Sequence, residues 1–125
     1  MIFPPALPEI PVASVDKAAA YYVKKLGFTV DWGDEQGGIA GISRGNCRLF
    51  ITNRSFREPH GNKGPVLFWL NVNSKAEVDK LFAEWKAAQA KILSEPEDKP
   101  WQLREFMAGD LDGNLIRVFY DFRRD

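Results

Sequence analysis

The strongest constraint in this sequence is that one order of secondary-structure elements occurs twice. Each half reads as a strand, a helix and three further strands, because alternating apolar residues predict strands and an apolar stripe at helical spacing predicts a helix. The predicted elements are a strand at 3–11, a helix at 15–27, strands at 28–32, 38–43 and 47–53, then a strand at 64–72, a helix at 75–90 and strands at 90–93, 104–111 and 114–122. Residue identity between the halves is low, so the repeat is one of architecture.

The ends of the helices carry clear signals. Ser14 is a typical N-cap and Gly27 a typical C-terminal stop for the first helix, while Ser74 and Glu77 form a capping box before the second. The remaining segments are predicted as turns or loops at 33–38, 44–46, 54–64 and 94–102, with a hairpin at "LDGN". Trp85 lies on the apolar stripe of the second helix, so we assign it to the core.

Two modules of this kind predict an α+β fold built as one domain over 1–125. A half of about 60 residues would leave one sheet face exposed if it stood alone. Packing the halves 1–62 and 63–125 together, or packing two chains, buries part of that face and leaves a cleft in a curved mixed sheet. We expect ligands to bind in this cleft.

Composition excludes several classes of protein. Lys plus Arg and Asp plus Glu both number 17, so the chain lacks the basic excess of a nucleic-acid-binding protein. Cys47 is the single cysteine, which excludes an intrachain disulfide and fits a reducing cytoplasm. No apolar run reaches the roughly 20 residues of a membrane span, and the first residues do not have the pattern of a secretory signal. We therefore expect a cytoplasmic protein with no membrane partner.

The tryptophans are the best candidates for ligand contacts. In the strand "VLFWLNV", Trp69 and Asn71 share one face with Leu67, and a polar Asn71 would be unpaired in a dry core. That face is therefore predicted to line the cleft. Trp101 follows a proline in a polar loop, where it either covers the core or offers a flat surface for stacking. Trp32 closes an alternating strand, where it either packs or forms part of the cleft wall.

Charged residues leave several alternatives open. The acidic residues beside Trp32 and before Trp101 form either a solvated surface or a rim that attracts a cationic ligand. Arg117 either pairs with a carboxylate such as Glu9 across the cleft, shapes the groove, or meets an anionic ligand group. Arg104 and Glu105 are neighbours in one strand and point to opposite faces, and the sequence does not decide which of them faces the cleft.

The duplicated module, with "YYVKKLGF" after the first helix and "GDLDGNLIRVF" at the end, resembles the vicinal oxygen chelate superfamily, which includes glyoxalases, extradiol dioxygenases and bleomycin-resistance proteins. Enzymes of this superfamily hold a metal with His, Gln or Glu. The corresponding positions here are Leu7 or Glu9, Leu67 and Arg117. Leucine has no donor atom for a metal and arginine has no lone pair to offer, so we expect no metal and no cofactor.

Within that superfamily, "AGISRGNCRLFIT", "VLFWLNV" and "KPWQLREF" are similar to the bleomycin-resistance branch. The resemblance implies a homodimer in which the N-terminal strand swaps between subunits at Pro8. It also implies a non-catalytic protein that sequesters a bleomycin-type glycopeptide in grooves at the dimer interface. The residues that the resemblance and the strand pattern together assign to ligand binding are Trp32, Ile39, Thr52, Trp69, Asn71, Trp101 and Arg117.

Two other functions stay open at this point. A glyoxalase-like or dioxygenase-like enzyme would need several metal ligands on the concave face, where the sequence offers at most Glu9. A binder of another flat aromatic metabolite would use the same cleft with a different lining. Ile39 and Asn71 favour this second alternative, because they stand where members of the branch can carry aromatic side chains.

Overall fold

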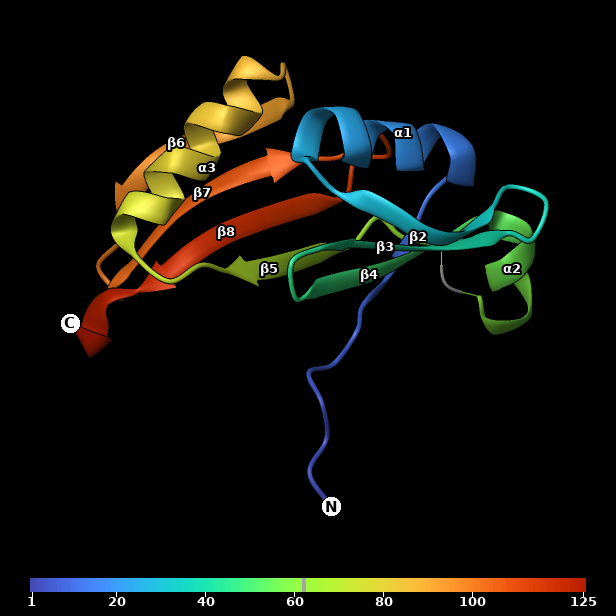
Figure 1. Ribbon diagram of the computed structural model, residues 1–125, viewed down its shortest axis with the longest axis horizontal. Helices are drawn as coiled ribbons and strands as arrows, with labels where there is room; N and C mark the ends of the chain where they lie inside the picture. Colours follow the sequence, from blue (N-terminus) through green and yellow to red (C-terminus); the bar gives the residue numbers. More distant parts are fainter. Residues whose placement is uncertain (62) are drawn as a thin grey trace. The chain divides into compact units, whose positions relative to one another are not determined.

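The computed structural model describes residues 1–61 and 63–125, with no side-chain description at Arg124. The chain forms two compact units, Met1–Pro65 and Val66–Asp125, and their boundary in the sequence lies three residues after the division that we expected between 62 and 63. Each unit contains a strand, a helix and three strands in this order, so the predicted α+β fold with two βαβββ modules is confirmed (Figure 1). That the two units act as one domain stays a prediction.

Unit 1 contains a four-stranded mixed sheet in the order β1-β4-β3-β2, with β1 parallel to β4 and the other pairs antiparallel. Its elements are β1 (Glu9–Pro11), α1 (Val15–Leu26), β2 (Thr29–Asp34), β3 (Ile39–Arg44), β4 (Cys47–Thr52), α2 (Arg54–Arg57) and a 3₁₀ helix (Glu58–His60).

Unit 2 repeats this topology in the order β5-β8-β7-β6, with β5 parallel to β8. Its elements are β5 (Leu67–Asn71), α3 (Lys75–Ala87), β6 (Lys91–Asp98), β7 (Leu103–Gly109), β8 (Leu115–Asp121) and a 3₁₀ helix (Phe122–Arg124).

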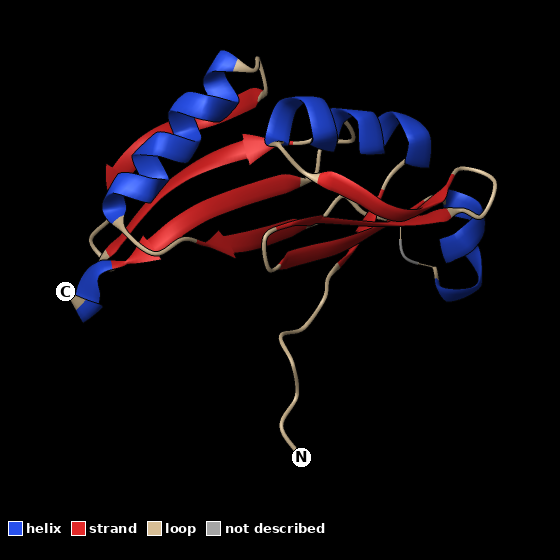
Figure 2. Ribbon diagram, viewed as in Figure 1, coloured by secondary structure: helices blue, strands red, loops and turns tan. Residues whose placement is uncertain are grey.

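In each unit one helix covers one face of the sheet (Figure 2), and the buried apolar side chains of the core lie between helix and sheet. The predicted caps are present: the Ser14 side chain accepts from the Lys17 amide, and Gly27 ends α1 in a left-handed conformation with φ 78°. Ser74 accepts from the Glu77 amide at 3.1 Å. The α1 side of unit 1 buries Val15, Ala18, Tyr22 and Leu26 against Ile10, Ala40, Ile42, Leu49 and Ile51.

The core of unit 2 is centred on an aromatic contact. Trp85 of α3 is 1% exposed and meets Phe106 of β7 edge to face, with ring centroids 5.6 Å apart. Ile116 and Val118 of β8 complete this side of the sheet and are fully buried. Trp85 therefore belongs to the core, as its helical spacing predicts. Strand residues that alternate with these, including Trp69, face away from α3, and we call that side of each sheet its open face.

Two segments differ from the prediction. The expected loop 54–64 contains α2 and the 3₁₀ helix, because the Asn53 side chain caps the Phe56 amide and starts a helical turn. The expected loop 94–102 is a strand as far as Asp98. Pro96 interrupts neither the sheet nor the strand because β6 lies at the sheet edge, and register shifts on either side of Ser94 accommodate it.

The N-terminal strand is shorter than predicted. Only Glu9–Pro11 pairs with β4, and residues 1–8 have no regular structure. Pro8 still contributes through its carbonyl, which accepts from the Phe50 amide at 3.0 Å. The preceding residues form a tail that extends away from the rest of unit 1 (Figure 1). Its side chains Met1, Ile2 and Phe3 are more than 80% exposed. The proposed exchange of this tail between subunits stays a prediction.

Candidate functional site

The open face of unit 1 carries an indole ring that lies close to the backbone of a neighbouring strand. Trp32 of β2 pairs with Gly41 of β3, and a Cβ added at Gly41 would lie 2.7 Å from Trp32 Cε2. The ring also meets Phe50 edge to face, with centroids 5.2 Å apart and an interplanar angle of 72°. Trp32 remains 44% exposed, so it offers an aromatic surface to solvent while the glycine and Phe50 fix its position.

The strand that carries Phe50 ends in a buried hydroxyl. Thr52 at the end of β4 is fully buried, and its Oγ1 donates to Glu9 Oε2 at 3.0 Å. Its strand partner on β3 is Ile39, which is half-buried. In this structure Thr52 therefore orients the exposed Glu9 carboxylate and has no surface of its own for a ligand. Ligand roles for Thr52 and Ile39 stay predictions.

The β2–β3 turn, between Trp32 and Ile39, is anchored by Glu35. One Glu35 carboxylate oxygen accepts from the Val15 amide at the start of α1, and the other accepts from the Asn53 side-chain amide at 2.8 Å. The Glu35 amide in turn donates to the Asp16 carboxylate at 3.0 Å. The hydrogen bond from Asn53 has the largest effect on the pKa of the Glu35 carboxyl and lowers it. Desolvation raises this pKa and the hydrogen bond from Val15 lowers it further, so that the net shift is downward.

The open face of unit 2 also carries an exposed tryptophan beside a phenylalanine. Trp69 is 44% exposed and meets Phe119 of β8 edge to face, with centroids 5.4 Å apart. Its strand partner is Arg117, whose guanidinium carbon lies 5.1 Å from the Trp69 ring centroid. At this distance the cation interacts favourably with the electron-rich face of the indole. Asn71 follows on the same face, opposite Phe119, and is exposed; its role in ligand binding stays a prediction.

A buried carboxylate joins Arg117 to the second candidate tryptophan of this unit. Glu105 of β7 has a side chain that is 5% exposed, and its Oε1 lies 3.3 Å from Arg117 Nη1. Its Oε2 accepts a hydrogen bond from Trp101 Nε1 at 3.1 Å. Trp101 lies in the β6–β7 connection and is 52% exposed, so it does not cover the core. Its indole is held by one polar contact and leaves an exposed surface for stacking.

The structure shows the partner of Arg117 within the chain and the faces of residues 104 and 105, while a ligand role for Arg117 stays a prediction. Arg117 pairs with Glu105 of its own sheet, whereas Glu9, the partner considered from the sequence, accepts from Thr52. Glu105 lies on the open face, and Arg104 points to the helix side, where it pairs with Asp79 of α3 at 2.9 Å. The alternation with buried Phe106 is the sequence signal that places Glu105 opposite the core.

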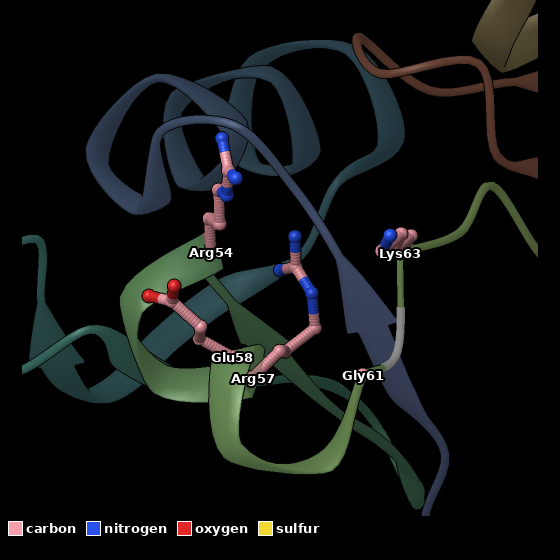
Figure 3. A pocket seen from close by; sticks show the side chains of 5 residues that line it. All are labelled: Arg54, Arg57, Glu58, Gly61 and Lys63. Atoms are coloured by element: carbon pink, nitrogen blue, oxygen red, sulfur yellow. The ribbon is translucent and has the colours of Figure 1, made fainter.

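Unit 1 also has a basic pocket that the sequence does not predict (Figure 3). The pocket has a volume of about 590 Å³ and is lined by Arg54, Arg57, Glu58, Gly61 and Lys63. Arg57 is 7% exposed, and its Nη1 donates to the carbonyls of Val12, at 3.3 Å, and Thr52. These bonds attach α2 to the ends of β1 and β4. No periodic signal marks an arginine in a polar run as buried.

The donors of the two open faces do not fit a metal ion. No group of three His, Cys, Asp or Glu side chains converges in the described part of the chain. Glu9 is hydrogen-bonded to Thr52, Glu105 is paired with Arg117 and Trp101, and Leu67 has no donor atom. A first-row metal site needs several nitrogen, oxygen or sulfur ligands. The metal that the fold family implies is therefore not matched by these residues.

Four residues of these faces were given no role in the site by the sequence argument. Gly41 supports Trp32, Glu105 joins Arg117 to Trp101, and Phe50 and Phe119 are the edge-to-face partners of the exposed indoles. The strand parity of Phe50 and Phe119 could have placed them on the open faces. The contact at Gly41 depends on a register shift between Val30 and Trp32, which the sequence does not reveal.

Comparison with known proteins gives a family and several similar structures. The family model described as "Glyoxalase/Bleomycin resistance protein/Dioxygenase superfamily" matches residues 6–118. No curated protein sequence gives a significant match. A bleomycin-binding protein from bleomycin-producing Streptomyces verticillus, solved with copper(II)-bleomycin, is 26% identical with a TM-score of 0.73, over 94% of this chain and 96% of that one.

Two further structures share the fold at lower identity. TioX from Micromonospora sp. ML1 is 24% identical with a TM-score of 0.75, over 92% of this chain and 96% of that one. A lactoylglutathione lyase from Agrobacterium tumefaciens is 21% identical with a TM-score of 0.73, over 94% of both chains. The fold is thus shared by a binding protein and an enzyme. Across the described residues, no helix is both long and apolar enough to cross a bilayer.

Proposed function

We propose that this chain, which belongs to the Glyoxalase/Bleomycin resistance protein/Dioxygenase superfamily, binds and sequesters a bleomycin-type glycopeptide without transforming it. The observation that carries the proposal is that three of its tryptophan side chains are exposed to solvent but held in fixed positions. Trp32, Trp69 and Trp101 are 44%, 44% and 52% exposed, although each is held in place by named contacts. Exposed indoles that are fixed in advance lose little entropy when a flat ring stacks on them.

The electrostatics of unit 1 suit a ligand with a cationic tail. Asp31, Asp34 and Glu9 are exposed and lie on or next to the strands that carry Trp32 and Phe50. With 17 acidic and 17 basic residues in the chain, this attraction is local and acts mainly on the rate of capture. A copper-bleomycin complex is the probe suggested by the 26% identical structure, which binds that compound.

We further propose that the protein works as a homodimer in the cytoplasm, with the grooves at the dimer interface and Pro8 as the hinge of an exchanged N-terminal strand. The exposed Met1, Ile2 and Phe3 support this arrangement, because three large apolar side chains in water favour a partner surface. Light scattering on the full chain and on a variant lacking residues 1–7 tests it: the dimer should weaken when the tail is removed.

Titration with copper-bleomycin tests the function. Binding should change tryptophan emission and raise the melting temperature in proportion to ligand concentration. Trp32→Ala and Trp101→Ala should each weaken binding by about 1–3 kcal/mol, the usual cost of losing one stacking ring. Unchanged emission and melting temperature at saturating ligand would contradict the proposal. So would a stoichiometric divalent metal ion in protein purified without chelator, because it would favour an enzyme.

A second candidate function is the capture of a different flat aromatic metabolite. Ile39 is half-buried and Asn71 is exposed on an open face, so the lining at these points is aliphatic and amide rather than aromatic. A thermal-shift screen across glycopeptides, quinones and flat heteroaromatic compounds separates the two candidates. Stabilisation by a quinone or heteroaromatic compound and not by a glycopeptide would favour the second one.

A further inference from the structure

Arg117 lies at the centre of the open face of unit 2 with few partners for a guanidinium. An arginine side chain has five N–H donors and no acceptor. Within the described residues, the one hydrogen bond found for Arg117 runs from Nη1 to Glu105 Oε1 at 3.3 Å, which is long for a charged pair. Arg117 and Glu105 are therefore joined by a single hydrogen bond, and they do not form the bidentate pair that arginine can make with a carboxylate.

A second observation shows that this arrangement is incomplete. Arg117 Nε is buried and has no hydrogen-bond partner among the side chains and backbone that the structure describes. A buried donor left without an acceptor is destabilising. The Arg117 side chain nevertheless keeps 30% of its surface exposed. An acceptor that arrives from the open side can reach the exposed part of this side chain, and it can pair with the buried Nε after a shift of the side chain.

The charge around Arg117 limits what that acceptor can be. Glu105 already balances the positive charge, and it is nearly fully buried. A second carboxylate at this place would meet Glu105 as a like charge in a partly desolvated setting. A neutral oxygen with a strong dipole, such as the carbonyl of a planar amide, gains the hydrogen bond and avoids the repulsion.

We infer that Arg117 is a binding site for an amide or similar neutral carbonyl oxygen, carried by a ligand whose ring lies against Trp69. This inference rests on the proposed function in taking the open face of unit 2 as a ligand surface, and it adds the chemical group that the face selects. Glu105 acts as a positioning residue, because it sets the charge at Arg117 and holds the Trp101 indole through the same carboxylate.

Three small probes test the inference: indole, indole-2-carboxamide and indole-2-carboxylate, each titrated by ligand-detected NMR. The carboxamide should bind about tenfold more tightly than indole, since it adds a hydrogen bond to a charged group. The carboxylate should bind no more tightly than the carboxamide. In Arg117→Gln the advantage of the carboxamide over indole should fall to less than twofold. An advantage that persists in Arg117→Gln overturns the inference.

Glu105→Gln gives a second and independent test. Glutamine keeps an oxygen for the Trp101 indole and removes the charge that balances Arg117. The carboxylate should then bind more tightly than the carboxamide, which reverses the order in the original protein. An unchanged order overturns the assignment of Glu105 as the residue that sets selectivity. The Arg117 Nε–H signal, identified by its loss in Arg117→Lys, should shift with the carboxamide and stay in place with indole.

Arg123→Gln is the matched control, because it removes an arginine of the same unit that pairs with Asp121 and is 60% exposed. It should leave the order of the three probes unchanged, and loss of that order in the control would overturn the inference. The copper-bleomycin titration is scored separately. If the drug fails to bind while the probe order holds, the proposed function falls and the carbonyl site stands. If the drug binds and the probe order fails, the carbonyl site falls alone.

Discussion

The two open faces place the same aromatic pair in two different ways. Trp32 with Phe50 and Trp69 with Phe119 are both edge-to-face pairs, with centroids 5.2 Å and 5.4 Å apart. In unit 1 the indole rests on Gly41, where a missing side chain makes room for it. In unit 2 the indole faces the Arg117 guanidinium, which is balanced by Glu105. One ring is positioned by steric fit and the other by charge.

This difference predicts different sensitivities. A ring that is positioned by fit should respond to added volume and hardly at all to salt. A ring that is positioned by a charged network should respond to removal of one charge, because the remaining partner is left uncompensated. The two repeated modules thus hold their exposed indoles by different interactions, and a substitution can alter the position of one indole without affecting the other.

The largest effect is expected from Glu105→Ala. The change leaves Arg117 without its carboxylate and the Trp101 indole N–H without its acceptor. We expect a loss of about 2–4 kcal/mol in the free energy of unfolding, below the full cost of breaking a buried pair because Arg117 is partly exposed. Chemical denaturation measures it. Glu97→Ala is the control, since Glu97 is 65% exposed in its pair with Lys99 and should cost less than about 0.5 kcal/mol. Equal losses for the two variants would contradict the buried network.

A smaller effect is expected from Gly41→Ala. The added methyl group would lie 2.7 Å from Trp32 Cε2, so the ring must leave the strand and lose part of its contact with Phe50. We expect a loss of about 1–3 kcal/mol in unfolding free energy, together with a shift of Trp32 emission to longer wavelength. Gly37→Ala is the control, because its Cβ would lie 3.6 Å from Asp34 Oδ1, an ordinary contact. Unchanged emission in Gly41→Ala would refute the steric account.

The smallest effect is a difference in how acid and salt act on the two units. The pKa of Glu35 is lowered chiefly by the neutral Asn53 amide, and the pKa of Asp98 is lowered by hydrogen bonds from Lys75 and Arg104. Both carboxylates stabilise the fold above their ordinary values of 4.5 and 3.8, and this contribution is lost as pH falls through the lowered folded-state pKa.

Glu35→Gln and Asp98→Asn should therefore each flatten the acid limb of a stability-against-pH curve. In 1 M salt the contribution of Asp98 should shrink, since its partners are charged and Asp98 itself is exposed, while that of Glu35 should persist. Denaturant titrations between pH 3 and pH 6 at two salt concentrations provide the comparison. An equal response of both carboxylates to salt would contradict the assignment of an amide as the main partner of Glu35.

Much of the fold follows from local sequence signals. Ser14, Gly27 and Ser74 mark helix ends by side-chain and backbone chemistry that acts within a few residues. The β7–β8 hairpin follows from "LDGN", where Gly113 has φ 82° and Asp110 accepts from the Asn114 amide at 2.9 Å. The extension of β6 through Pro96 is not a local property, because it depends on β6 lying at the sheet edge.

Part of the candidate site was also predictable from local sequence signals. Strand parity places Trp69 and Asn71 on the open face, and the polar surroundings of Trp101 indicate its exposure. The role of Glu105 depends on partners on the neighbouring strand and in the preceding turn. A one-dimensional pattern cannot supply such contacts, since they are set by register and by which strands are neighbours.

The burial of Trp85 has a practical consequence for every optical experiment on this protein. At 1% exposure its indole is out of reach of an aqueous quencher such as iodide, whereas the other three indoles are accessible. One fluorophore thus serves as an internal standard that reports only unfolding, and the remaining three report events at the surface. The ratio of quenchable to protected emission separates capture of a ligand from loss of structure within a single cuvette.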